Sequence, residues 1–206
     1  PIVAQNNVVT LADNYGEQTE IYNGVDLSVS LRLPSGAVLQ GGTSTGRVTT
    51  GNCFVVDSPQ QLLNCDITPP FMTQVKVLGV YPWPWWGIQT SATVQSLPGP
   101  EITAGRSYTS AEVIGSLGRP LTTGTPTVPL IEPGTEYGGR LNQVDFRLSK
   151  VFRFASSARV AANVDLYNMF NASPTLALNT TYGSAWLRPL QILQGRLLKF
   201  SAQLDF

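Results

Sequence analysis

A strict alternation of apolar and polar residues constrains this chain more than any other feature. From Gln143 to Phe154 apolar residues fill most even positions, and polar or charged residues fill most odd ones. The segments Arg159–Phe170 and Leu198–Phe206 repeat the pattern, the second up to the last residue. Because successive side chains of a β-strand point to opposite faces, each segment predicts a strand with one apolar and one polar face.

Similar but weaker patterns occur earlier in the chain, and they predict an all-β fold of about seven strands. No convincing amphipathic helix competes with them, and the segment Val9–Ile21 is ambiguous, serving as a lead into the first strand. The expected strands cover residues 25–33, 37–52, 74–81, 86–95, 143–154, 158–170 and 198–206.

The connections between these strands fall into two classes that alternate. Short turns are expected near 34–36, 82–85 and 156–157, where proline, glycine and serine gather. Long connections are expected near 53–72, 98–140 and 171–190. Outer-membrane barrels alternate tight periplasmic turns with longer extracellular loops, so the pattern favours an antiparallel up-and-down transmembrane β-barrel segment.

The charge content agrees with a membrane wall and excludes several other classes. Charged residues make up 13% of the chain, with 13 Lys+Arg and 13 Asp+Glu, about half the share usual in soluble domains. No basic patch is present, so a nucleic-acid partner is not expected. The apolar runs fall far short of the ~20 residues of a membrane-spanning helix, whereas a barrel strand needs only ~9–11.

Reactive residue types are scarce. The chain has no histidine, which excludes a Ser-His-Asp arrangement within it, and the carboxylates are scattered, so we expect neither an enzyme nor a cofactor. Cys53 and Cys65 are the two cysteines. They either form a disulfide in an oxidising compartment or remain small, partly buried thiols, and they are too few for a zinc site.

The two faces of the expected strands suggest two environments. The apolar face would contact outer-membrane lipid, with Trp83, Trp85 and Trp86 in an aromatic girdle on the periplasmic side. The polar face would line the lumen. The candidates for the lumen-facing residues are Asp26, Arg32, Gln89, Gln95, Asp145, Arg147, Asn163, Asp165, Lys199 and Gln203.

Two questions stay open at this stage. Lys150 shares the parity of Phe146 and Phe152, so it either lies near the interface and snorkels or follows a bulge that shifts the parity. Alternating strands also build β-sandwiches, so a soluble or surface-displayed sandwich that serves in binding or adhesion is the alternative function.

Several short segments resemble a known family. The chain is similar to the C-terminal part of TonB-dependent receptor-like proteins, of the carboxypeptidase-regulatory-like or Oar-like type. The matching segments lie mostly after residue 134. They are Gly134–Gly138, Arg140–Asp145, Asp165–Asn168, Phe170–Ala172, Asn179–Gly183, Ala185–Pro189, Ile192–Gln194 and Gln203–Phe206, with Tyr22–Asp26, Pro69–Phe71 and Gln74–Lys76 upstream.

This resemblance implies a bacterial outer-membrane location and a larger barrel of about 22 strands around a plug. Residues 1–206 would then form the C-terminal portion of the barrel domain, as a fragment without the plug and the N-terminal strands. The chain also begins without Met or a signal peptide. The expected function is import of an unidentified nutrient, with the rest of the barrel, the plug and TonB as partners.

The end of the chain is similar to the C-terminal assembly signal of outer-membrane barrels. In that family the last strand is read by the barrel assembly machinery, which would make that machinery a further partner. The physical basis is an open strand edge with unpaired backbone groups. The residues in question are Leu198, Phe200, Ala202, Leu204 and Phe206.

Overall fold

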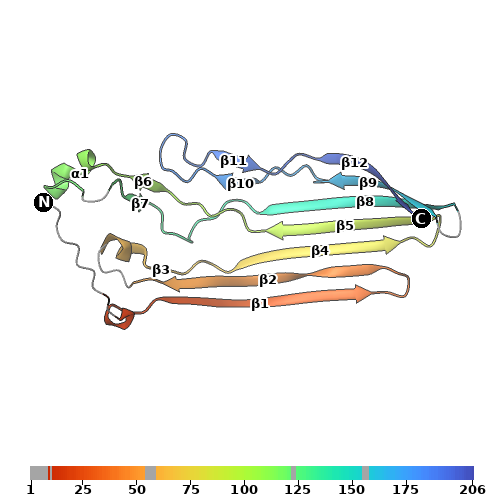
Figure 1. Ribbon diagram of the computed structural model, residues 1–206, viewed down its shortest axis with the longest axis horizontal. Coiled ribbons are helices and arrows are strands. Elements are labelled where there is room, and N and C mark those ends of the chain that lie inside the picture. The colour runs from red at the N-terminus through yellow and green to blue at the C-terminus, as the bar shows by residue number, and fades with distance from the viewer. Residues whose placement is uncertain (1–8, 10, 54–58, 122–123, 155–157) are drawn as a thin grey trace.

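Seven long antiparallel strands lie side by side in one open sheet (Figure 1). The structure is a computed structural model that describes residues 9, 11–53, 59–121, 124–154 and 158–206. Strands account for 54% of the residues and helices for 7%, which places the chain in the all-β class. In sheet order the long strands are β1 (Thr19–Arg32), β2 (Val38–Gly51), β4 (Met72–Pro82), β5 (Ile88–Leu97), β8 (Leu141–Arg153), β9 (Arg159–Tyr167) and β12 (Leu197–Asp205).

Eight shorter elements complete the described structure. Two-residue β3 adds to the end of β2, and the pairs β6–β7 and β10–β11 form small separate sheets. Apart from η1, which precedes β1, all of them lie in the long connections. The bounds are η1 Ala12–Asn14, η2 Pro59–Asn64, β3 Asp66–Ile67, β6 Gly105–Ser107, α1 Ser110–Leu117, β7 Thr127–Pro129, β10 Thr175–Leu178 and β11 Pro189–Ile192.

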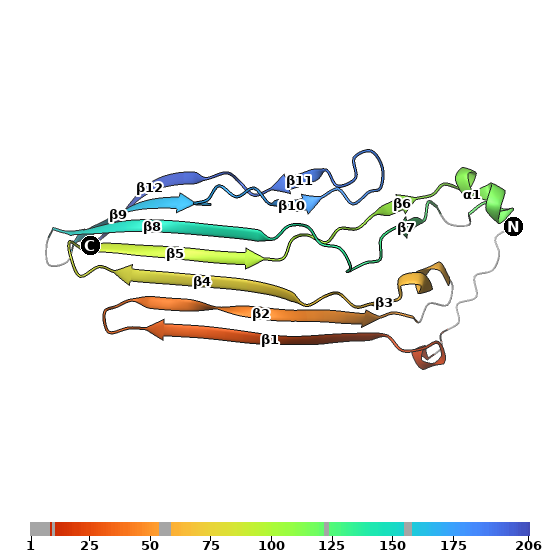
Figure 2. The same cartoon turned by 180° about the vertical axis from the view of Figure 1, so that it is seen from behind.

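The short and long connections lie at opposite ends of the sheet (Figure 2). Each short turn leaves five residues between strands, at 33–37, 83–87 and 154–158, and Phe206 follows β12 at the same end. In the first turn Gly36 has φ 84°, a conformation that glycine adopts without strain. The expected turn at 156–157 lies outside the described residues. We call this end the turn end and the opposite one the loop end.

Strand order, direction and the alternation of connections are therefore as the sequence predicts, but several strand boundaries differ from the expected ones, by up to six residues. β1 starts at Thr19, six residues before the expected start. Trp86 lies in the turn before β5 with φ 58°. β9 ends at Tyr167, because Asn168 turns the chain with φ 49° and takes Phe170 out of the strand.

No helix replaces an expected strand, but the sequence analysis did not identify α1, which lies inside the 98–140 connection. Both ends of α1 carry local signals. The backbone N–H of Thr109 donates to Glu112 at 2.8 Å, and Gly118 closes the helix with φ 66°. A helix of eight residues is too short for its apolar periodicity to stand out, so the Thr-x-x-Glu start and the glycine stop are the signals that could have identified it.

The register divides the side chains of the sheet into two faces. Residues that pair across antiparallel strands point to the same side, and side chains alternate along each strand. One continuous row is Leu31, Leu39, Gly79, Ala92, Phe146, Leu166 and Leu198. The next row is Arg32, Val38, Val80, Ser91, Arg147, Asp165 and Lys199. We call the side of the first row the apolar face and the side of the second the polar face.

Neither face is covered by a second layer within the described residues. The buried hydrophobic residues there are only Ala37 and Ala104, and Leu27 and Phe200 are 63% and 71% exposed. The long strands contact one another edge to edge and not face to face, so the described chain does not build a sandwich by itself. Among the helices of the described chain, none has the length and hydropathy needed to span a membrane.

Aromatic side chains gather on the apolar face at the turn end. The ring of Trp83 lies 5.0 Å from that of Tyr81 and 5.9 Å from that of Trp85. On the other side of β5, the rings of Phe152 and Phe154 stack at 6.4 Å. These rings remain exposed, Trp85 at 62%, so they form a surface feature and not a core.

Lys150 lies in a regular strand, so the alternative of a bulge that shifts its parity is excluded. The pairing of β8 with β5 and with β9 runs through Lys150 without a shift, so no bulge changes its parity. The side chain reaches toward the turn end, where its Nζ donates to the carbonyl oxygen of Trp86 and lies 5.6 Å from the ring of Phe152.

Candidate functional site: the polar face and the loop end

All ten residues singled out as lining a lumen lie on the polar face. Strand parity and register put them there without exception, across five of the seven long strands. The set is Asp26, Arg32, Gln89, Gln95, Asp145, Arg147, Asn163, Asp165, Lys199 and Gln203. The sequence therefore identified a shared surface, and the lumen itself stays a prediction.

An ion pair holds the centre of this face between β8 and β9. Nε and Nη2 of Arg147 both donate to the carboxylate of Asp165, and the distance from Nη2 to Oδ2 is 3.1 Å. The Asp165 side chain is only 4% exposed, whereas that of Arg147 is 46% exposed. Lys199 lies on the other side of Asp165 in the same row. A two-bond arginine–carboxylate pair fixes the orientation of both side chains.

A second polar row runs beside the ion pair. Ser149 Oγ donates to Asn163 Oδ1 at 2.7 Å, and Asn163 Nδ2 donates to Ser201 Oγ at 3.5 Å. Closer to the turn end, Arg159 Nε donates to Asp205 Oδ2 at 2.8 Å. The polar face of β8, β9 and β12 is therefore a network of side chains that bond to one another.

A chain of hydrogen bonds leads from this face into the loop end. Gln95 Nε2 donates to Gln143 Oε1 at 2.9 Å, and Gln143 Nε2 donates to Asp145 Oδ1 at 2.9 Å. The backbone N–H of Asn168 donates to the same carboxylate at 2.8 Å. Asp145, which the sequence placed in the lumen, thus also anchors the start of the last long connection.

Asn168 organises that connection. It is 3% exposed, and its Nδ2 donates to the carbonyl oxygens of Ala172 and Gln194, both at 2.8 Å. Its Oδ1 accepts from the backbone N–H of Ala172 at 2.8 Å. Sequence reasoning noticed Asn168 only as part of the family resemblance. Asparagine tolerates the left-handed conformation and can bond the backbone locally, which was the available signal.

The long connections join one another at the loop end. Gly105 N donates to Thr180 O and Tyr182 N donates to Gly105 O, both at 2.9 Å. Trp186 Nε1 donates to Thr103 O at 3.0 Å. These bonds tie residues 98–140 to residues 168–196, so the two connections form one structured body over the sheet end.

Three hollows in the described residues offer space for a ligand, two at the loop end and one over the middle of the sheet. The first, of about 740 Å³, lies where β1 starts and β2 ends, and Glu20 is the charged residue of its lining, with Gln18, Asn52 and Asn64. The second, of about 500 Å³, lies over β1, β2 and β4, with Asp26, Gln40 and Lys76 in its lining. The third, of about 380 Å³, contains Tyr22 and Tyr137 among prolines.

Two loop-end groups have shifted pKa values. The hydrogen bond from the Thr109 backbone, then its hydroxyl, lowers the pKa of Glu112. This contribution to the start of α1 is therefore present above the ordinary pKa of glutamate and is lost as the pH falls through the lowered value. Burial, then the charge of Glu101, raises the pKa of Tyr137, so its phenol stays protonated at neutral pH.

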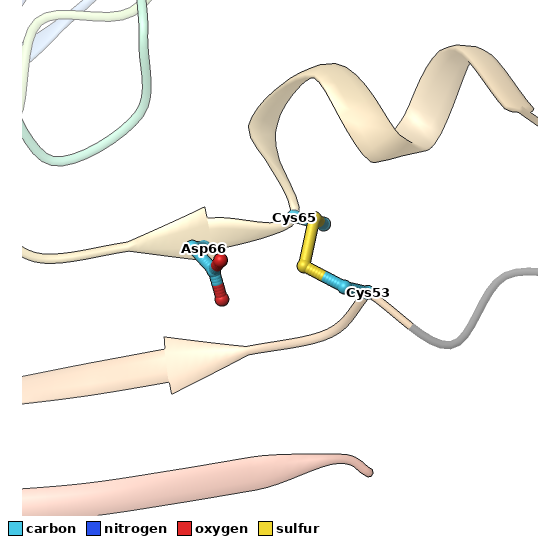
Figure 3. A group of neighbouring side chains, drawn as sticks. All are labelled: Cys53, Cys65 and Asp66. Atoms are coloured by element: carbon cyan, nitrogen blue, oxygen red, sulfur yellow. A yellow bond between two sulfur atoms is a disulfide. The ribbon is translucent and has the colours of Figure 1, made fainter. Parts of the chain in front are cut away.

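A disulfide closes the first long connection. Cys53 and Cys65 are joined, with their Cα atoms 4.8 Å apart (Figure 3). Asp66 lies next to them, but sulfurs that are bonded to each other are not thiolates and do not offer the usual metal ligands. The clip brings the backbone of Asn52 to Cys65, where Asn52 N donates to Cys65 O at 2.7 Å.

The arrangement as a whole can bind and orient a polar molecule. It combines a networked polar face, hollows lined by amides and carboxylates, and loops fixed by hydrogen bonds and a disulfide. No known protein family, curated protein or solved structure matches this chain. The function must therefore be inferred from the arrangement and from the sequence resemblance.

The disulfide gives a first prediction. Replacing both cysteines (Cys53→Ser with Cys65→Ser) should destabilise the closed connection by about 3 kcal/mol, the chain-entropy value for a loop of this length. Limited proteolysis should then cut residues 52–71 faster, and a reductant should speed the cutting of the natural protein only. Equal cutting rates for variant and natural protein would contradict the stabilising role.

The ion pair of the polar face gives a second prediction. Arg147→Met should lower the free energy of unfolding by about 1–3 kcal/mol, because it leaves the Asp165 carboxylate with fewer donors. The exchange Arg147→Asp with Asp165→Arg should restore part of this loss. Urea unfolding of the natural protein and variants in detergent measures both. The single variants Arg147→Asp and Asp165→Arg serve as references. If the double variant is no more stable than the less stable of these two, the pair itself contributes nothing.

Proposed function

We propose that this chain is part of the barrel wall of a bacterial outer-membrane receptor that imports a nutrient. In this assignment lipid covers the apolar face, the polar face lines the lumen, and the loop end faces outward to receive the ligand. The segment joins the rest of its barrel through β1 and β12, whose outer edges pair with no described strand.

One observation carries the proposal. The sheet is a single layer with an apolar and a polar face, and no described element covers either of them. A soluble sheet needs protein over its apolar face. A barrel wall needs lipid there and water on the other face, and all its backbone groups pair within the wall.

The height of the apolar face supports a membrane crossing. In β8 it extends from Val144 to Phe152, which is roughly 27 Å at the usual rise of a strand. A tilt of about 40° reduces this to about 20 Å, close to the band of about 25 Å that lipid covers in such barrels. Toward the loop end the same face turns polar, with Thr45, Thr73 and Ser96.

The turn-end border of this band and the last strand also fit. The rings of Tyr81, Trp83 and Phe152 lie at the turn end, where an aromatic girdle would meet the lipid headgroups. Leu198, Phe200, Ala202 and Leu204 lie on the apolar face of the last strand, and Phe206 at its end is 97% exposed. Recognition of this strand by the barrel assembly machinery is part of the same proposal.

The import function rests on the family resemblance and on the loop end. The matching segments Asp165–Asn168 and Asn179–Gly183 are also segments that tie the loops to the sheet and to each other. The first hollow places Gln18, Glu20 and Asn52 beside a ligand, so we propose a nutrient with polar groups that these side chains can bond. Energy would come from TonB, a separate partner, acting through a plug that belongs to the wider receptor.

The direct test is membrane extraction of the natural protein, expressed from its complete gene. We expect it in the outer-membrane fraction, released only by detergent and migrating faster on gels before heating than after. A protein purified as a stable monomer in plain buffer would overturn the proposal and favour a soluble binding module.

A pair of neighbouring substitutions tests which face contacts lipid. Ala92→Arg puts a charge on the apolar face and should cost about 2–4 kcal/mol near the bilayer centre. Thr93→Arg puts the same charge on the polar face opposite Asp145 and should cost much less. Urea unfolding in lipid vesicles measures both variants. Equal costs, or a larger cost for Thr93→Arg, would contradict the assignment of the faces.

A further inference from the structure

Charged side chains are distributed unequally between the two faces. The seven long strands contain thirteen, and eleven lie on the polar face, five acidic and six basic. The apolar face of these strands contains two, Arg47 and Lys150, and both are basic. They lie at opposite borders of the apolar band, Lys150 at the turn end and Arg47 at the loop end.

Each of these two cations lies over an aromatic ring. The guanidinium carbon of Arg47 is 4.6 Å from the ring centre of Phe71, and Lys150 Nζ is 5.6 Å from that of Phe152. An aromatic ring fixes a cation without neutralising it. A cation held over an aromatic ring therefore occurs at both borders of the band.

The two cations differ in what they bond. Lys150 donates to the carbonyl oxygen of Trp86, within its own border. In the described part of the chain the guanidinium of Arg47 makes no hydrogen bond and no ion pair, and its Nε is both inaccessible and unpaired. An arginine that is fixed but unpaired has donors left for a ligand.

The surroundings of Arg47 suit an anion. Along the same border the hydroxyls of Thr45 and Thr73 meet at 2.9 Å, and Arg140 donates through Nη2 to the Thr73 carbonyl at 2.6 Å. Arg140 also donates through Nε and Nη2 to the hydroxyl of Ser96. Ser96 lies two strands from Arg47, a separation of about 10 Å at the usual strand spacing. The Nη1 of Arg140 bonds to no described residue.

Among the described residues, no carboxylate forms an ion pair with either of these two guanidinium groups. On the apolar side of the sheet, Asp66 pairs with Gly51, four residues along β2 from Arg47, which is roughly 13 Å at the usual rise. Glu101 is occupied by the backbone N–H of Gly134 at 2.6 Å. The border therefore offers two cations and several hydroxyls to a group outside the chain.

We propose that Arg47, with Arg140 beside it, binds the phosphate of a lipid headgroup in the leaflet at the loop end. Guanidinium matches phosphate with two parallel hydrogen bonds, and a headgroup lies at this height when the acyl chains cover Val25, Val75 and Val94. This inference rests on the proposed function, because it needs lipid against the apolar face.

The test uses the natural protein in detergent, titrated with short-chain phosphatidic acid and followed by native mass spectrometry. Arg47→Gln should weaken binding by at least about 5-fold, the contribution of one arginine near an anionic lipid surface. Arg47→Lys should retain part of the affinity. The matched control Arg32→Gln removes the same charge from the polar face and should bind like the natural protein.

Two further ligands identify what is recognised. Diacylglycerol, which lacks the phosphate, should not distinguish Arg47→Gln from the natural protein, and millimolar inorganic phosphate should not displace phosphatidic acid. Equal affinity of Arg47→Gln and the natural protein for phosphatidic acid would overturn the inference, as would displacement by inorganic phosphate. If the protein still needs detergent, either of these two results overturns the lipid-binding inference alone and leaves the proposed function standing. Purification in plain buffer would overturn both the inference and the proposed function.

Discussion

The whole structure depends on the fact that, in the part of the chain that the structure describes, no second layer of protein covers its apolar side chains. Backbone hydrogen bonds hold the strands in register, but they stabilise a sheet only modestly when both faces meet water. The free energy that normally holds a domain together comes from burying apolar surface. Here that surface includes Val29, Phe146 and Phe200, all on one side of a single layer, and in the proposed function lipid supplies the layer that covers it.

Much of this architecture follows from the sequence because it rests on local rules. Period-two alternation fixes which side chains share a face, so all ten polar residues could be assigned to one face from parity alone. Turn chemistry around Pro34–Gly36 and Pro82–Pro84 fixes which strands are neighbours. The up-and-down order then follows, since antiparallel strands with short turns pair with their neighbours in the chain.

The loop end could not be predicted in the same way, because its structure rests on contacts between distant residues. Nothing local indicates that Trp186 donates to Thr103, or that Gly105 pairs with Thr181. The spacing of Cys53 and Cys65 permits a disulfide and does not require one. Helix α1 was missed for a different reason: its cap residues are clear, but eight residues are too few to show a periodic apolar stripe.

The three short turns have a consequence for how the chain reaches its final shape. The pairs β1–β2, β4–β5 and β8–β9 each close over five residues, so little conformational entropy is lost in forming them. Joining one pair to the next requires closing much longer connections. The three hairpins are therefore the natural first folding units, and the sheet grows by docking preformed ribbons, with each docking event covering two open strand edges.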